Sequence, residues 1–195
     1  MNRRKELEKD LNQQELFEAL SALNNSLDSA FHEKYDRSLP FTELMFDRWE
    51  RAKKLGFGEG SSIYDNSLVF GKVSVGKNCW VGPFTILDGS GGLVIGDFCT
   101  ISSGTHIYSH DNVKQTLSSG NLPIDREKVI VGKNTYIGPN TIISKGVSIG
   151  DYCVVGSQSF LKSDVPDYSI VAGQPAVIIG KVIIDKEQIS FNYKK

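Results

Sequence analysis

Aliphatic residues recur every six positions through most of this chain, and this period limits the possible folds more than any other feature. Neither a helix, with 3.6 residues per turn, nor a strand, with alternation every two residues, produces a period of six. A fixed period of this kind indicates stacked, similar units. Three such series contain fourteen residues: Ile63, Val69, Val75, Val81 and Leu87; Ile95, Ile101 and Ile107; and Val131, Ile137, Ile143, Ile149, Val155 and Leu161.

The neighbours of these aliphatic residues share the period, because glycine often follows them and a small residue usually lies four positions after them. We interpret each unit as a short strand and a sharp turn. Three units close one coil of a three-sided prism, and successive coils pair in parallel. The three cysteines, Cys79, Cys99 and Cys153, occupy the small interior position. We therefore interpret them as buried structural residues rather than as catalytic thiols.

The first part of the chain has a different character, since none of the 19 glycines precedes Gly56. Leucines at positions 16, 20, 23 and 27 line one face of a predicted helix, and Pro40 interrupts the helical pattern. The expected organisation is a helical region over residues 1–56, the prism over 57–182 and a tail over 183–195. We expect the tail to form a strand or a short helix that packs on the prism.

Composition excludes several classes of protein. A net charge of −1 gives no electrostatic reason to expect a nucleic-acid partner. The sequence has no run of about 18 apolar residues, so no membrane helix is expected. The N-terminus lacks the apolar segment of a signal peptide, and we expect a cytoplasmic protein. Three widely spaced cysteines fit neither a disulfide framework nor a zinc site of the CxxC type.

The period breaks between Ile107 and Val131, where a polar segment indicates a loop extruded from the prism near residues 108–129. His110 lies at the base of this loop, and histidine is the usual general base near neutral pH. On the residues alone, a solvated loop histidine is the simpler interpretation of His110. His106 should point outward from its coil and is a second candidate base or an acceptor contact. His32 is interpreted as a surface residue of the helical region.

A smaller break lies at Asp88–Gly92, where the register slips by two residues. One interpretation is a bulge at a corner of the prism, tolerated because glycine accepts positive φ angles. The other is a wall of an acceptor pocket, in which Asp88 would accept hydrogen bonds from the substrate.

The repeat resembles the left-handed parallel β-helix of the hexapeptide-repeat acyltransferases over about residues 57–182. The segment Ile101–Asp111 is similar to the catalytic segment of the sugar O-acetyltransferase branch, where a histidine at the base of an extruded loop deprotonates the acceptor hydroxyl. The resemblance assigns this role to His110. Asp111 either orients the imidazole or is a turn residue. With His106 and Asp88, it is expected to contact the acceptor.

The end of the repeats, Ala172–Ala176, resembles the A-G-x-P-A segment that lies beside the pantetheine arm and adenine of coenzyme A in this family. It is expected to cap the prism as well. Other cofactor contacts follow from their position on the coils that flank the same groove. The cofactor contacts implied in these ways are Tyr136, Ser157, Lys162, Gly173 and Pro175.

The resemblance implies transfer of an acetyl group from acetyl-CoA to a hydroxyl of a sugar or glycan precursor, by direct attack on the thioester in a homotrimer. The alternatives are N-acetylation of a nucleotide-linked amino sugar, acetylation of a streptogramin-type antibiotic, and a non-catalytic scaffold. No metal is expected. A carbonic-anhydrase-like zinc site needs three histidines, and besides His106 and His110 the chain has only His32, in the helical region.

Overall fold

The computed structural model describes residues 11–186 and 188–194, which divide into two compact units between Asp47 and Arg48. The first unit holds helix α2 (Leu11–Tyr35) and the short helix α3 (Phe41–Met45). Pro40 precedes α3 directly, so the predicted interruption lies between the two helices. Leu16, Leu20 and Leu23 on α2 are 40–60% exposed. The structure therefore contains the N-terminal helix that the sequence predicts, and residues 1–10 of the predicted helical region lie outside the described residues.

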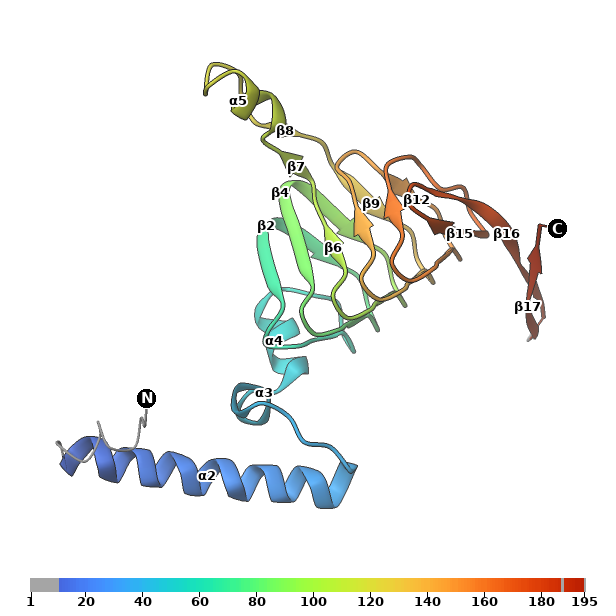
Figure 1. Cartoon of the computed structure of the whole chain (residues 1–195). Helices are drawn as coiled ribbons and strands as arrows, with labels where there is room; N and C mark the ends of the chain where they lie inside the picture. The colour runs from blue at the N-terminus through green and yellow to red at the C-terminus, as the bar shows by residue number, and fades with distance from the viewer. Residues whose placement is uncertain (1–10, 187, 195) are drawn as a thin grey trace. The chain divides into compact units, whose positions relative to one another are not determined.

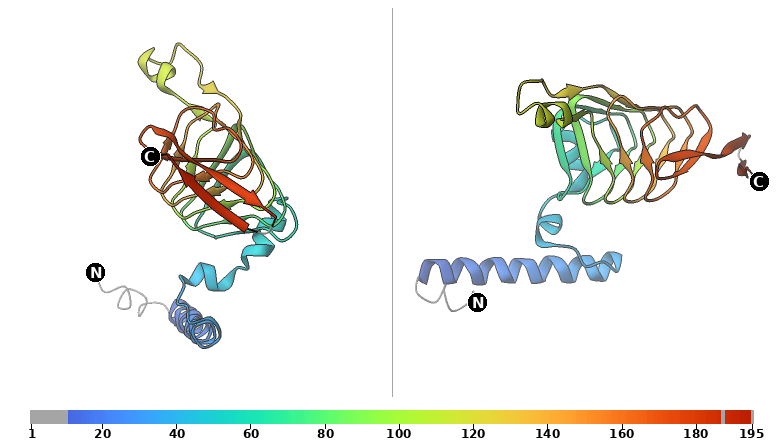
Figure 2. Two further views of the ribbon diagram at one scale, coloured as in Figure 1. Left: turned by 90° about the vertical axis from the view of Figure 1, so that its right-hand side faces the viewer. Right: turned by 45° about the horizontal axis from the view of Figure 1, so that its top comes forward.

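The second unit begins with helix α4 (Arg48–Lys54) and continues as a parallel β-solenoid (Figures 1 and 2), which confirms the predicted fold class. Its first face is one sheet of parallel strands: β1 (Ser62–Ile63), β3 (Trp80–Val81), β5 (Thr100–Ile101), β10 (Tyr136–Ile137), β13 (Val154–Val155) and β15 (Ser169–Gly173).

Two long strands, β2 (Leu68–Val75) and β4 (Ile86–Ile95), run through both remaining faces. Ile86–Leu87 of β4 pairs with β6, whereas Leu93–Ile95 pairs with β9, so the strand turns a corner between them. The other strands of these two faces are β6 (His106–Ile107), β11 (Ile142–Ile143) and β14 (Phe160–Leu161) on the second, and β9 (Val129–Val131) and β12 (Ser148–Ile149) on the third.

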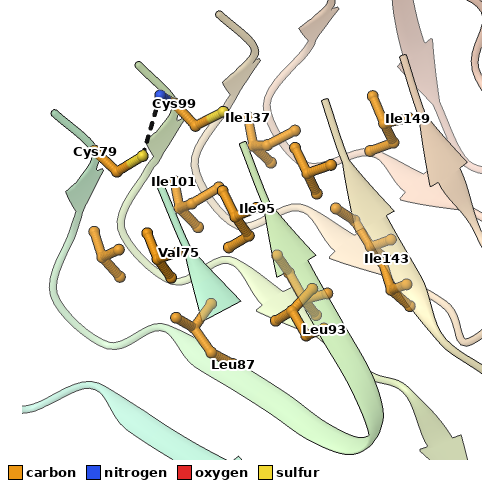
Figure 3. Packing of buried hydrophobic residues seen from close by; sticks show 14 of the residues in the cluster. Val75, Cys79, Leu87, Leu93, Ile95, Cys99, Ile101, Ile137, Ile143 and Ile149 are labelled. Carbon is orange, nitrogen blue, oxygen red and sulfur yellow. Dashed lines mark hydrogen bonds between the residues drawn. The ribbon is translucent and has the colours of Figure 1, made fainter. Parts of the chain in front are cut away.

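The interior is filled by the residues of the six-residue period. Thirteen of the fourteen aliphatic residues are buried, and Val69 packs against them partly buried. Leu93 and Val129, outside the period, fill the interior beside the bulge. The cysteines are free and buried, and each thiol donates a hydrogen bond to a backbone carbonyl. Figure 3 shows Cys79 and Cys99 on neighbouring strands, joined by the hydrogen bond that the backbone N–H of Cys99 donates to Cys79 Sγ.

A helix covers one end of the solenoid, and an antiparallel pair of strands covers the other. At the first coil, the guanidinium of Arg51 on α4 donates hydrogen bonds to the carbonyl oxygens of Tyr64 and Ser67. At the last coil, β16 (Ala176–Asp185) pairs antiparallel with β15 and with β17 (Gln188–Tyr193). The predicted tail therefore contains the end of β16 and the whole of β17. Within the described residues, the structure contains no helix that is long and apolar enough to span a membrane.

Neighbouring isoleucines on β11 test the packing directly. Ile143 is fully buried, whereas Ile142 is 42% exposed. We expect Ile143→Ala to lower the free energy of unfolding by about 2–5 kcal/mol, because it leaves a cavity between coils. Ile142→Ala should cost less than about 1 kcal/mol. Urea unfolding of the two variants measures both values, and equal losses would contradict the proposed division between interior and surface.

Candidate active site

The predicted loop leaves the second face after β6 and returns to the prism at β9 (Figure 1). Its base is a short antiparallel ladder of β7 (His110–Asp111) and β8 (Asp125–Arg126), with helix α5 (Val113–Leu117) between them. Glu127 donates its backbone N–H to the carbonyl of Ser109 at 2.9 Å, which extends the ladder toward the prism. His110 is therefore a strand residue at the base of the loop, where backbone pairing restrains it.

A buried carboxylate holds the imidazole of His110. Asp88 is 1% exposed, and its Oδ2 lies 2.6 Å from Nδ1 of His110. The same oxygen accepts a hydrogen bond from the backbone N–H of Ser109 at 2.8 Å, and Oδ1 accepts one from Ser90 at 3.0 Å. Desolvation by burial acts to raise the pKa of Asp88, but the hydrogen bonds from Ser90, His110 and Ser109 outweigh it and lower the pKa to about 2.

This contact determines which ring nitrogen of neutral His110 is free. An ionised carboxylate can only accept hydrogen bonds, so Nδ1 must carry the proton that faces Asp88. Nε2 then keeps its lone pair, which is the state required of a general base. The side chain of His110 is 36% exposed, so the ring is open to solvent although Asp88 occupies its Nδ1 side.

The glycine-rich bulge allows the close approach of Asp88 and the loop. A Cβ atom at Gly91 would lie 2.3 Å from the carbonyl oxygen of Ser109, and one at Gly89 would lie 2.3 Å from that of Lys72. Only glycine therefore fits at these two positions. The bulge was expected either as a tolerated corner or as a pocket wall with Asp88 facing the acceptor. In the structure, the carboxylate of Asp88 is buried and turned to His110.

A cavity of about 410 Å³ opens beside His110. Six of its seven lining residues carry a polar or ionisable side chain, so the wall offers several hydrogen-bonding groups to a hydroxyl-rich small molecule. Ser144 and Lys145 were missed by the sequence interpretation, although Ser144 follows Ile143 as Tyr108 follows Ile107, and this repeat register could have placed them at one corner. The lining residues are Tyr108, His110, Asp111, Asn112, Ile124, Ser144 and Lys145. A larger cavity, of about 640 Å³, lies in the first unit. Asp28 is the one ionisable side chain in its lining, and no histidine lines it.

Asp111 lines the cavity beside His110, whereas His106 does not. Asp111 is the last residue of strand β7 and lies on the cavity wall, where its Oδ1 accepts a hydrogen bond from the backbone N–H of Val113 at 3.1 Å. The imidazole of His110 is held by Asp88 instead. His106 lies on β6 outside the cavity lining, with Nδ1 at 3.3 Å from the hydroxyl of Tyr108, which does line the cavity.

The predicted cofactor residues lie on separate parts of the solenoid. Ser157 and Gly173 share the corner between the first two faces, where the backbone N–H of Gly173 bonds to Ser159 Oγ at 3.2 Å. Pro175 lies two residues after Gly173, is joined to Gln174 by a cis peptide bond, and is exposed. Tyr136 is 44% exposed on the first face. Lys162 follows β14 on the corner that also carries Ser144. A single chain therefore does not gather these five residues with His110 into one cavity.

The described residues contain no cluster of three or more histidine, cysteine, aspartate or glutamate side chains that could hold a metal ion.

Two family models match the solenoid: the bacterial transferase hexapeptide over residues 128–163, and the hexapeptide repeat of succinyl-transferase over residues 72–109. The two matches together cover 74 of the 195 residues, all of them in the solenoid, and there the chain is similar to the hexapeptide-repeat transferases.

Curated relatives of this hexapeptide-repeat protein include several acetyltransferases. A probable acetyltransferase of Mycobacterium tuberculosis is 29% identical over 70% of this chain and 44% of its own length. A chloramphenicol acetyltransferase of Agrobacterium fabrum is 30% identical over 48% of this chain and 54% of its own. The galactoside O-acetyltransferase of Escherichia coli is 28% identical over 56% of this chain and 64% of its own. The matches thus span about half the length of these relatives.

Solved structures of hexapeptide-repeat transferases share the fold. The N-acyltransferase AntD from Bacillus cereus, in complex with dTDP and coenzyme A, has a TM-score of 0.57 and 27% identity, over 68% of this chain and 88% of its own. A hexapeptide-repeat acetyltransferase from Vibrio cholerae, complexed with acetyl-CoA, covers 84% of this chain and 87% of its own, with a TM-score of 0.52 and 24% identity, and it supports the fold alone.

The ionised state of Asp88 predicts a pH-dependent stability. Folding lowers the pKa of Asp88 to about 2, from an ordinary value of about 3.9. The contribution of the ionised carboxylate to stability is therefore complete above the unfolded pKa and is lost as pH falls toward 2. At pH 7 we expect Asp88→Asn to be less stable by roughly 2–3 kcal/mol, and this deficit should shrink as pH falls from 5 to 3. Urea unfolding across this range measures it, and a deficit independent of pH would contradict the assignment.

Proposed function

We propose that this protein is an acetyl-CoA-dependent O-acetyltransferase that acts on a hydroxyl of a sugar or glycan precursor, with His110 as the general base. The observation that carries the proposal is the 2.6 Å contact between Asp88 Oδ2 and His110 Nδ1 beside an open polar cavity. In the neutral form of the ring, this contact places the proton on Nδ1 and leaves Nε2 available to an acceptor. The acetyltransferases among the relatives support the acyl donor.

The reaction needs a base because a sugar hydroxyl is a weak nucleophile. Nε2 of His110 takes the hydroxyl proton as the acceptor oxygen bonds to the thioester carbonyl carbon. The tetrahedral intermediate then collapses, the carbon–sulfur bond breaks, and the imidazolium gives the proton to the departing thiolate. The Asp88 carboxylate stabilises the transient positive charge of the ring while remaining ionised. Both substrates bind together, so no acyl-enzyme is required.

The cavity wall supports a polyhydroxylated acceptor. Tyr108, Asn112 and Ser144 offer two hydroxyl groups and an amide, which can both donate and accept hydrogen bonds. A sugar presents the same mixture of donors and acceptors around its ring. The similarity to the galactoside O-acetyltransferase of Escherichia coli favours this class of acceptor.

A second candidate is N-acylation of a nucleotide-linked amino sugar. The Bacillus cereus neighbour favours it, because a structure of that N-acyltransferase contains dTDP-4-amino-4,6-dideoxyglucose and coenzyme A. The chloramphenicol acetyltransferases among the relatives keep an antibiotic acceptor as a third candidate. A purely structural scaffold is disfavoured, because it would have no use for a buried carboxylate that orients an accessible imidazole.

We further propose that the enzyme works as a homotrimer, with acetyl-CoA bound between neighbouring prisms. The separation of the predicted cofactor residues supports this arrangement. Gly173 and Ser157 lie on one corner of the prism and the His110 cavity lies at another. A cofactor could contact the Gly173 corner of one chain and the His110 cavity of its neighbour at the interface between the two chains.

Loss of the base should abolish turnover without preventing cofactor binding. We expect His110→Ala to reduce kcat by about 10²–10⁴-fold, with the Kd for acetyl-CoA changed less than about threefold. His32→Ala, on the exposed surface of α2, is the matched control and should keep normal turnover. Thiol release from acetyl-CoA, measured with a panel of sugars, nucleotide-linked amino sugars and antibiotics, tests the role and identifies the acceptor. Near-normal turnover by His110→Ala would rule out this mechanism.

A further inference from the structure

Lys145 stands at the centre of an ion-pair cluster on the wall of the His110 cavity. Its Nζ lies 2.5 Å from Glu127 Oε1, 3.6 Å from Asp111 Oδ2 and 3.9 Å from Asp125 Oδ2. The lysine side chain is only 18% exposed. Lys145 belongs to the corner of the prism after β11, whereas its three partners belong to the base of the extruded loop. This ammonium therefore joins the loop to the prism.

The partners of Lys145 would repel one another without it. Asp111 on β7 and Asp125 on β8 are direct cross-strand partners, and like charges in that position destabilise an antiparallel pair. Glu127 adds a third carboxylate just after β8. Lys114 on α5 neutralises part of this charge through Asp125, at 2.9 Å. Among the ion pairs of the described residues, those of Lys145 alone reach both strands of the ladder.

Backbone contacts place this cluster against the return strand beside His110. The N–H of Gly146 donates to the carbonyl of Glu127 at 3.4 Å, and a Cβ atom at Gly146 would lie 2.6 Å from Glu127 Oε2. His110 pairs with Arg126, which lies between Asp125 and Glu127. Any separation of β7 from β8 would therefore displace the imidazole from the acceptor cavity. Asp88 holds only the Nδ1 side of the ring.

We propose that Lys145 is a positioning residue, which clamps the two strands of the loop base together and so holds His110 and the cavity wall in the geometry that binds the acceptor. This inference rests on the proposed acetyltransferase function. Lys145 does not itself take a proton from the acceptor. The hydrogen bond that its ammonium donates to Glu127, together with the charges of Glu127, Asp111 and Asp125, raises the pKa of Lys145 and keeps the ammonium protonated.

Steady-state kinetics with acetyl-CoA and methyl β-galactoside test the clamp. We expect Lys145→Met to raise the acceptor KM at least fivefold and to lower kcat, with the KM for acetyl-CoA changed less than twofold. Lys145→Arg keeps the charge and should remain within about threefold of the wild type. Lys133→Met is the matched control, because it removes a lysine–aspartate ion pair to Asp151, on a different corner, and should leave all three constants unchanged.

A double variant separates the clamp from simple loss of a side chain. Asp125→Asn removes the repulsion between the facing carboxylates, so Lys145→Met combined with Asp125→Asn should recover part of the lost acceptor affinity. A structural role alone would instead make the double variant worse than either single variant, because each would remove a separate contact. No recovery in the double variant, or normal acceptor constants in Lys145→Met, would overturn the proposal.

Hydrogen exchange keeps this test independent of the proposed activity. We expect Lys145→Met to accelerate exchange of the β7 and β8 amides at least tenfold, while Lys133→Met leaves them unchanged. If the wild type releases no thiol with any acceptor, the proposed function fails, and the exchange rates still decide whether Lys145 clamps the loop. Unchanged exchange in Lys145→Met would overturn the clamp, even in an active enzyme.

Discussion

Parallel pairing of each coil with the next is the interaction on which the rest of this structure depends. Most solenoid strands contain two residues, too few to be stable alone, and they gain stability by stacking over a continuous aliphatic interior. This stacking also fixes the register. His106 must face Ile142 although the whole loop separates them in sequence, so the inserted residues can only leave the prism at a corner.

The candidate active site follows from two departures from the period that share one corner. Leu87 pairs with Ile107, so the residues that follow them, Asp88 in the bulge and Ser109–His110 at the loop base, are brought side by side. Glycine at position 91 allows the approach, and the prism supplies a rigid, buried place for the carboxylate. Burial of a charge is tolerated here because Asp88 accepts hydrogen bonds from several donors. The regular coils thus supply a rigid scaffold, and the two interruptions of the repeat carry the candidate catalytic pair, Asp88 and His110.

Much of the fold could be predicted from the sequence because one residue type at a fixed spacing repeats, as Ile137, Ile143 and Ile149 do. The same spacing located the loop and placed His110 at its base. The direction of the Asp88 side chain could not be predicted, because it depends on the register shift between β2 and β4 at the bulge. Lys145 was missed because its carboxylate partners lie on the loop, where the period gives no register. The cofactor residues remain predictions, since they lie on surfaces that one chain does not bring together.

The central claim is that Asp88 holds the neutral imidazole of His110 with the proton on Nδ1 and the lone pair on Nε2. Nitrogen NMR of histidine-labelled protein, with His32 and His106 replaced in turn to assign the signals, measures this tautomer directly. The account predicts a protonated Nδ1 with a strongly hydrogen-bonded, downfield proton that is lost in Asp88→Asn. A neutral His110 that carries its proton on Nε2, or a ring whose signals do not change in Asp88→Asn, would contradict it.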